Sequence, residues 1–233
     1  MGQAIIRVAK KHPDLTAAAI WVRDEQQALA TLGNADNVCV SEDLDHVVAI
    51  SDVLIDFSLP EGTDRVLESV ARQGKPLACG VSGLSDTQID ALNKAAITVP
   101  VVYDRNMSLG IAVLERSVRE AAASLGPDFD VEISEVHHVH KKDAPSGTAL
   151  KLGEAIAAAR GESGTGSVRF EAERRGEVPG DHQVVMRSAT ECLSFSHSVT
   201  TRQVFADGAL RAARWAVGRP PGRYRMSDVL FGA

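Results

Sequence analysis

The chain has 233 residues, of which 44% are hydrophobic and 24% charged, and this composition is typical of a globular protein rather than a disordered one. Its formal net charge of −6 argues against nucleic-acid binding, so an anionic ligand would need a local basic patch. The sequence predicts a cytoplasmic protein. Its three cysteines are widely spaced, its start has no apolar leader, and it has no apolar run of membrane length.

The first half of the chain predicts strands and helices in alternation. A helical pattern at 3–11 opens the sequence, a second runs from Pro60 to Gly74, and Ser85 is placed to cap a third. Strand-like apolar runs are found at 15–22, 52–57, 76–79 and 97–103. Such alternation indicates βαβ units and a mostly parallel sheet.

The second half has a different pattern. A long helix is predicted from Ser108 to about Leu125, and a helix over 202–217 closes the region. Strand-like runs at 130–136, 167–170, 183–187 and 192–199 are separated by a helix that ends near Arg160 and a Gly/Ser-rich loop at 161–167. This half therefore predicts an α+β arrangement with a mixed or open sheet.

The segment 135–150, EVHHVHKKDAPSGTAL, concentrates the chemistry of the chain. Its basic cluster consists of His137, His138, His140, Lys141 and Lys142. The turn after it leads into Ser146, Gly147 and Thr148 at the start of a predicted helix, where unpaired N–H groups and the helix dipole favour an anion. The spacing predicts a carboxylate site, with Lys141 as a proton donor and an imidazole that orients or exchanges protons.

Other readings of this segment stay open. His137, His138 and His140 could bind a metal ion, although the adjacent lysines would repel it. The lysines could simply form a solvated face beside a helix cap. Ser146 could be a nucleophile, but no Gly-x-Ser-x-Gly elbow surrounds it, and a role as helix N-cap is favoured.

The pattern E-x-H-H-x-x-K-x-D-A-P-S-G-T-A resembles the signature of the 4-hydroxy-tetrahydrodipicolinate reductases, also called dihydrodipicolinate reductases. These are nicotinamide-dependent enzymes of the diaminopimelate route to lysine. The resemblance extends over most of the chain, through segments 55–58, 60–63, 80–83, 106–110 and 205–209. It implies hydride transfer to a cyclic imine-type substrate, with a lysine supplying the proton.

Carried onto this sequence, the resemblance makes His137 the acid/base histidine and Lys141 the proton donor. It implies that His138, Gly147 and Thr148 hold a substrate carboxylate. The cofactor-binding residues that it implies are Gly80, Val81 and Ser82 near the nicotinamide ribose and Asp104, Arg105, Asn106 and Met107 in the loop between the two domains. The family also forms homotetramers through its substrate-domain sheet.

The fold that the resemblance implies has two domains. A Rossmann-like α/β nucleotide-binding domain would span 1–107 and 208–233. An α+β domain with a mixed open sheet would span 108–207, bind the substrate and form the oligomer. We expect this second domain to be about a dozen residues shorter than in many relatives.

Two departures from the family pattern concern the cofactor. The family begins with a strand and a G-x-x-G-R-M-G turn, whereas this sequence begins at Met1-Gly2, the last residues of that turn, so we expect the true start to lie upstream. Met1 would then be a cofactor-binding residue. The alternative is a non-catalytic relative that binds a dicarboxylate but no cofactor. Arg23 follows the strand 15–22 where an acid is common, so it could pair with a 2′-phosphate and admit NADPH at least as well as NADH.

Overall fold

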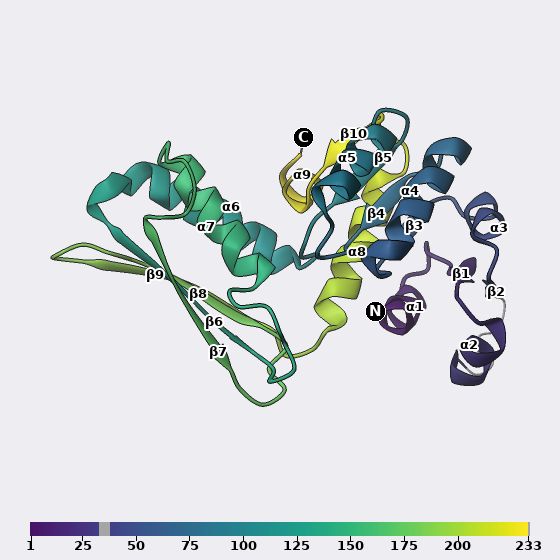
Figure 1. Cartoon of the computed structure of the whole chain (residues 1–233), viewed down its shortest axis with the longest axis horizontal. Helices are drawn as coiled ribbons and strands as arrows, with labels where there is room; N and C mark the ends of the chain where they lie inside the picture. The colour runs from purple at the N-terminus through teal and green to yellow at the C-terminus, as the bar shows by residue number, and fades with distance from the viewer. Residues whose placement is uncertain (33–37, 233) are drawn as a thin grey trace. The chain divides into compact units, whose positions relative to one another are not determined.

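The computed structural model of the chain describes residues 1–32 and 38–232. They form two compact units, which are treated separately below (Figure 1). The first unit comprises Met1–Met107 and Phe205–Ala233, and the second comprises Ser108–Val204. The chain thus leaves the first unit once and returns to it near the C-terminus.

The first unit is an α/β structure with two parallel sheets. Its strands are β1 (Ala19–Trp21), β2 (Cys39–Ser41), β3 (Leu54–Asp56), β4 (Leu77–Cys79), β5 (Pro100–Tyr103) and β10 (Gly222–Tyr224). Its helices are α1 (Gly2–Ala9), α2 (Glu25–Leu32), α3 (Leu44–Ala49), α4 (Pro60–Gln73), α5 (Asp86–Ala95), α8 (Gln203–Ala216) and α9 (Met226–Phe231). Four strands are paired in the order β10-β5-β4-β3, and β1 is paired with β2 in a separate two-stranded sheet.

Local sequence explains the helices around this sheet. Pro60 occupies the first turn of α4, and Gly74 ends the helix in the left-handed conformation (φ 69°), which glycine adopts without steric cost. Ser85 and Gln88 form a capping box at the start of α5, as predicted for Ser85. The apolar faces of α4 and α5 pack onto the buried strands β4 and β5 and form the main core of the unit.

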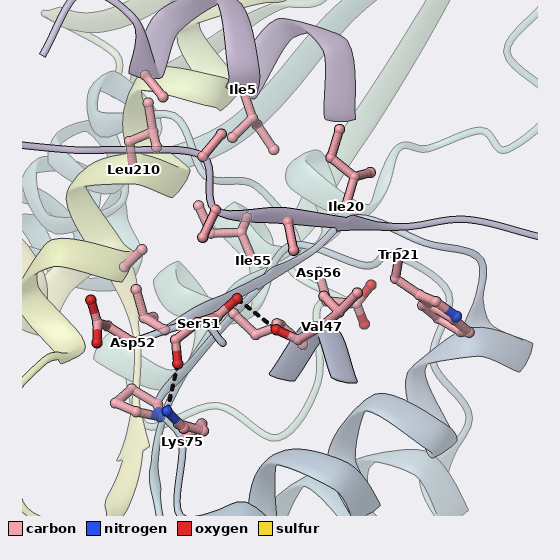
Figure 2. A pocket seen from close by; sticks show the side chains of 18 of the residues that line it. Ile5, Ile20, Trp21, Val47, Ser51, Asp52, Ile55, Asp56, Lys75 and Leu210 are labelled. Atoms are coloured by element: carbon pink, nitrogen blue, oxygen red, sulfur yellow. Dashed lines mark hydrogen bonds between the residues drawn. The ribbon is translucent and has the colours of Figure 1, made fainter. Parts of the chain in front are cut away.

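A cavity of about 960 Å³ separates β1 from β3 (Figure 2). All residues of both strands line it, together with Ile5 of α1 and Leu210 of α8. Backbone groups of successive residues in a strand point to opposite sides. The Ala18 carbonyl accepts a hydrogen bond from the Cys39 amide of β2, so the backbone groups of Ala19 point away from β2, toward the cavity. The Leu54 amide donates to the Pro76 carbonyl, just before β4, so the backbone groups of Ile55 point away from β4, also toward the cavity. Two parallel strand edges therefore face each other across this cavity.

The second unit is built on one continuous four-stranded sheet in the order β7-β6-β8-β9 (Figure 1). Its strands are β6 (Asp130–His137), β7 (Val168–Arg174), β8 (Asp181–Arg187) and β9 (Cys192–Ser198). The β6–β7 pair is parallel and the other two pairs are antiparallel, which confirms the mixed sheet. Helices α6 (Leu109–Leu125) and α7 (Gly147–Ala159) pack on each other and bury the apolar face of the sheet, which includes Ile133, Val184 and Met186.

Several predicted boundaries were wrong. Of the predicted strand 15–22, only Ala19–Trp21 is a strand. The predicted strand 97–103 begins at Pro100, because the amides of Ile97 and Thr98 bond to the last carbonyls of α5 instead of joining the sheet. Conversely, the strand predicted at 167–170 continues to Arg174. Helices α2, α3 and α9 and strands β2 and β10 were not predicted; they are three to eight residues long and carry little periodic signal.

None of the helices in the described residues is long and apolar enough to cross a membrane.

Candidate active site

The segment that follows β6 places the predicted catalytic side chains at the start of α7. Glu135 and His137 are the last inward-facing residues of β6, Lys141 and Asp143 lie in the loop, and α7 begins at Gly147. The neighbouring strands complete the site: the pairing register places His182 of β8 opposite Glu135 and Arg174 of β7 opposite His137.

The carboxylate of Glu135 lies at the centre of this site and is fully buried. Its Oε1 accepts a hydrogen bond from the Ser146 amide (3.0 Å) and lies 3.4 Å from the Arg174 guanidinium. Its Oε2 lies 3.5 Å from Nδ1 of His137 and 3.7 Å from Nε2 of His182. A carboxylate withdrawn from water needs such partners, because an isolated buried charge would be strongly unfavourable.

The two buried imidazoles are held in their neutral form. Burial lowers the pKa of His137 below its usual value; Glu135 opposes this shift, and the charges of Lys141 and Arg174 add to it. Burial, the imidazoles of His137 and His197, and Lys141 lower the pKa of His182 to about 3. Both rings are therefore uncharged at neutral pH.

Lys141 forms an ion pair with Asp143, two residues further along the loop. Its Nζ donates to both carboxylate oxygens of Asp143, at 2.7 and 2.8 Å. Burial raises the pKa of Asp143, but the hydrogen bond and charge of Lys141 outweigh this and lower it overall. The Arg174 guanidinium donates to the carbonyls of Lys141 and Asp143, so the strand β7 fixes the loop that carries the lysine.

The start of α7 forms a capped helix N-terminus. The Ser146 hydroxyl accepts a hydrogen bond from the Ala149 amide (3.1 Å), which confirms the predicted N-cap role. The same hydroxyl is 3.3 Å from Nε2 of His182. Thr148 is buried and Gly147 is half-buried in the first turn, where a helix dipole favours a carboxylate.

The three histidines considered for a metal site do not converge. His138 is half-buried, while His140 is exposed and faces Glu177 at 3.4 Å. Among the described residues, the group whose metal-ligating atoms lie within 4.8 Å of one another is instead Glu135, His137 and His182. Arg174 and Lys141 place two positive charges beside this group, which disfavours a cation there.

The residues predicted to bind the cofactor lie in the first unit, after parallel strands. Arg23 follows β1, residues 80–82 follow β4, and residues 104–107 follow β5. Carboxyl ends of parallel strands are the usual place for a ligand in an open α/β sheet. Gly80 donates its amide to the carbonyl at the end of β3 and packs against the Phe57 ring, where a Cβ would lie 2.4 Å from a ring atom.

These residues differ in what their side chains offer a ligand. Arg23, Ser82 and Arg105 are exposed, while Val81 is buried and Asn106 is half-buried. The Asp104 carboxylate is buried and accepts hydrogen bonds from the amides of Asn106 (3.3 Å) and Met226 (3.4 Å), and the Met107 side chain is 1% exposed. Met1 is the N-cap of α1, and its carbonyl accepts from the amides of Ala4 and Ile5.

Comparison with known proteins identifies the family. Two family models match: dihydrodipicolinate reductase, N-terminus, over residues 1–107, and dihydrodipicolinate reductase, C-terminus, over residues 110–230. The chain belongs to the dihydrodipicolinate reductase family, a family of NAD(P)H-dependent oxidoreductases.

Relatives in this family support the assignment. The 4-hydroxy-tetrahydrodipicolinate reductase of Halorhodospira halophila is 40% identical, over 99% of this chain and 94% of the relative. That of Xanthomonas campestris is 46% identical over 77% of this chain and 73% of the relative. Among solved structures, dipicolinate-bound dihydrodipicolinate reductase from Paenisporosarcina sp. TG-14 has a TM-score of 0.81 at 21% identity, covering 98% of this chain and 95% of that one, and so shares its fold.

Members of the dihydrodipicolinate reductase family use a nicotinamide cofactor, and the first unit fits one in part. The carboxyl ends of β1, β3, β4 and β5 offer the usual ligand position, and α1 offers a helix N-terminus. The cavity between β1 and β3, however, lies between the two sheets whose strand ends offer this position. Residues 80–82 and Arg23 would hold the cofactor, and its chemistry is delivery of a hydride.

Three side chains of the site were not predicted to act in it: Glu135, Arg174 and His182. Glu135 was recognised only as part of the family motif. His182 carries a signal that could have been used, because it alternates in phase with the buried residues Val184 and Met186 of β8. Arg174 carries no comparable signal, since only the register of β6 with β7 places it beside His137.

Proposed function

We propose that this chain catalyses the NAD(P)H-dependent reduction of 4-hydroxy-tetrahydrodipicolinate to tetrahydrodipicolinate, a step of diaminopimelate and lysine biosynthesis. The observation that carries the proposal is the convergence of a neutral imidazole (His137), an ammonium group (Lys141) and a helix N-terminus around residues 135–148. These are the groups needed to hold an anionic substrate and to supply a proton to it.

The substrate is proposed to bind as a dicarboxylate at the start of α7. His138, Gly147 and Thr148 would hold one carboxylate, where the helix dipole adds to their hydrogen-bonding capacity. The dipicolinate-bound relative supports a ligand of this class. Nζ of Lys141 donates hydrogen bonds to both carboxylate oxygens of Asp143. Lys141 would therefore have to break these hydrogen bonds before it could donate to the substrate.

Proton supply follows from the same geometry. Lys141 is proposed as the acid that protonates the substrate as it accepts the hydride, since an ammonium group carries a transferable proton at neutral pH. His137, neutral and 3.5 Å from Glu135, is proposed to act as acid/base partner and to exchange that proton. Gly180 leaves room for this ring, because a Cβ there would lie 2.9 Å from Nε2 of His137.

Either NADPH or NADH is proposed as the reductant. The exposed Arg23 at the end of β1 is suited to pair with a 2′-phosphate, which favours NADPH. Cytoplasmic location and a homotetramer belong to the same proposal, and light scattering of the purified chain tests the oligomer.

The cavity in the first unit supports one competing function. A relative that binds the dicarboxylate but not the cofactor would keep the second unit intact and lack a complete sheet under the cofactor. Titrating the chain with NADPH at micromolar concentration, followed by nucleotide fluorescence and then by turnover, separates the two functions. Saturable binding and turnover support the reductase; dicarboxylate binding without NADH or NADPH binding would instead establish the non-catalytic role for this chain.

A further inference from the structure

The buried Glu135 carboxylate lies beside four other groups of the site. Oε1 is shared between the Ser146 amide and the Arg174 guanidinium, and Oε2 faces two imidazoles. Glu135 itself does not contact a reacting atom in the proposed reaction. Its partners include His137, which is proposed to act in the reaction, the first turn of α7 through the Ser146 amide, and Arg174, which donates to a carbonyl of the Lys141 loop.

We propose that Glu135 is the positioning residue of this site: it selects the tautomer and orientation of His137 and, through Arg174, fixes the loop that carries Lys141. The inference rests on the proposed function for the roles of the histidine and the lysine. It assigns to Glu135 a task that neither the family match nor the motif specifies.

The pairing of Glu135 with His137 follows from two buried atoms. Oε2 of Glu135 and Nδ1 of His137 are both buried without a hydrogen-bond partner, and they lie 3.5 Å apart. Buried polar atoms in native proteins are nearly always paired, and a small rotation of either side chain closes this distance. A carboxylate can only accept, so the pair requires the proton on Nδ1 and leaves Nε2 of His137 free to take up a proton.

The imidazole of His182 does not compete with His137 for Oε2 of Glu135. Nε2 of His182 lies 3.3 Å from the Ser146 hydroxyl but 3.7 Å from Oε2 of Glu135. His182 is thus engaged by the N-cap of α7, and its pKa of about 3 keeps it uncharged. Oε2 of Glu135 is left for His137.

Arg174 connects the Glu135 carboxylate to the loop that carries Lys141. Arg174 lies 3.4 Å from Oε1 of Glu135 and also donates to the carbonyls of Lys141 and Asp143. Its side chain is only 20% exposed, and the Glu135 carboxylate supplies a nearby negative charge. One carboxylate therefore holds His137, the lysine loop and, through the Ser146 amide, the first turn of α7.

The test replaces the charge without changing the volume. Glu135→Gln is compared with the full-length wild type and with Glu132→Gln, a matched change on the same strand at a side chain that is 38% exposed. For each variant we would measure turnover of 4-hydroxy-tetrahydrodipicolinate with NADPH, the pH profile of that turnover and the affinity for NADPH. The ¹⁵N spectrum of histidine-labelled protein reports the tautomer of His137, with His137→Gln identifying its signals.

We expect Glu135→Gln to lower kcat roughly 10- to 100-fold, the size of effect typical of residues that orient an active group. It should also shift the pH profile and move the His137 signals away from the Nδ1–H tautomer, while NADPH affinity and the Glu132→Gln variant remain like wild type. Normal kcat with a normal pH profile in Glu135→Gln overturns the inference. So does reduced activity with an unchanged tautomer, which would indicate a merely structural role.

The spectroscopic readout keeps this inference separate from the proposed reaction. If the wild type showed no turnover, the proposed function would fail, but the tautomer of His137 would still test Glu135. If Glu135→Gln failed to fold, the wild-type spectrum alone decides, because an Nε2–H tautomer of His137 would rule out the proposed hydrogen bond.

Discussion

The two units differ in how completely their sheets are formed. In the second unit, β6 pairs over seven residues with each neighbour, and the register delivers Arg174 and His182 to Glu135. In the first unit, strands of three or four residues leave two parallel edges facing a cavity of about 960 Å³. The comparison teaches that a site assembled across paired strands is fixed by their register, whereas one at the end of an open sheet depends on the whole sheet beneath it.

The largest effect that we expect is in the second unit. Lys141→Ala should lower turnover by roughly 10²- to 10⁴-fold, because it removes the proposed acid, while NADPH affinity stays unchanged. Steady-state kinetics and fluorescence titration measure the two quantities. Lys142→Ala, at the exposed neighbouring position, is the control. Wild-type turnover of Lys141→Ala would refute the assignment of the acid.

The next prediction addresses the first unit directly. An apolar strand of about five residues, joined to Met1 through a Gly-rich turn, should occupy the cavity and pair with β1 and β3. If this strand adds about 2 kcal/mol to the free energy of unfolding, Tm should rise by about 4–8 °C in a chain of this size. NADPH should also bind more tightly. Calorimetry and nucleotide titration measure both. A Gly/Ser extension of equal length is the control, and an equal gain with it would contradict strand pairing.

Acid should destabilise the second unit. The pKa of His182 is about 3 in the folded chain against 6.5 unfolded, so only the unfolded state takes up this proton below pH 6.5. Its contribution to stability is present above pH 6.5 and is lost as the pH falls toward 3, by about 2 kcal/mol between pH 6.5 and 5. Denaturant unfolding at several pH values in this range measures how the free energy of unfolding depends on pH. His182→Gln should weaken this dependence, whereas the control His46→Gln, at an exposed position in the first unit, should leave it unchanged.

A smaller effect is expected at Asp143. Asp143→Asn removes the carboxylate that holds Lys141 and repels an anionic ligand, so dipicolinate should bind several-fold more tightly. Calorimetric titration with dipicolinate checks this. Weaker binding would instead mean that Asp143 orients Lys141 for the ligand.

The smallest expected effect is at Arg23. Arg23→Ala should weaken NADPH binding a few-fold and leave NADH binding unchanged, since an exposed ion pair contributes at most about 1 kcal/mol. Fluorescence titration with both nucleotides measures the difference. Equal weakening of both would show that Arg23 does not contact the 2′-phosphate.

Local pattern was enough to predict the longer helices, α4 to α8. The capping residues Ser85 and Ser146 and the glycine that ends α4 act within one turn of chain, so their roles follow from the sequence alone. The alternation of Val131 and Ile133 with polar residues in β6 likewise matches the alternating burial of that strand. Segment 135–150 carries the resemblance to the reductase family, and the family models confirm that family.

Only the tertiary structure decided which distant residues complete the site and where the sheet is interrupted. Arg174 and His182 reach Glu135 through strand register, and the short strands β2 and β10 exist because they pair with β1 and β5 rather than because of their own composition. These are contacts between segments far apart in the chain, whose free energy comes from burial and pairing in the folded state. A sequence pattern within one helix or strand therefore does not predict these contacts.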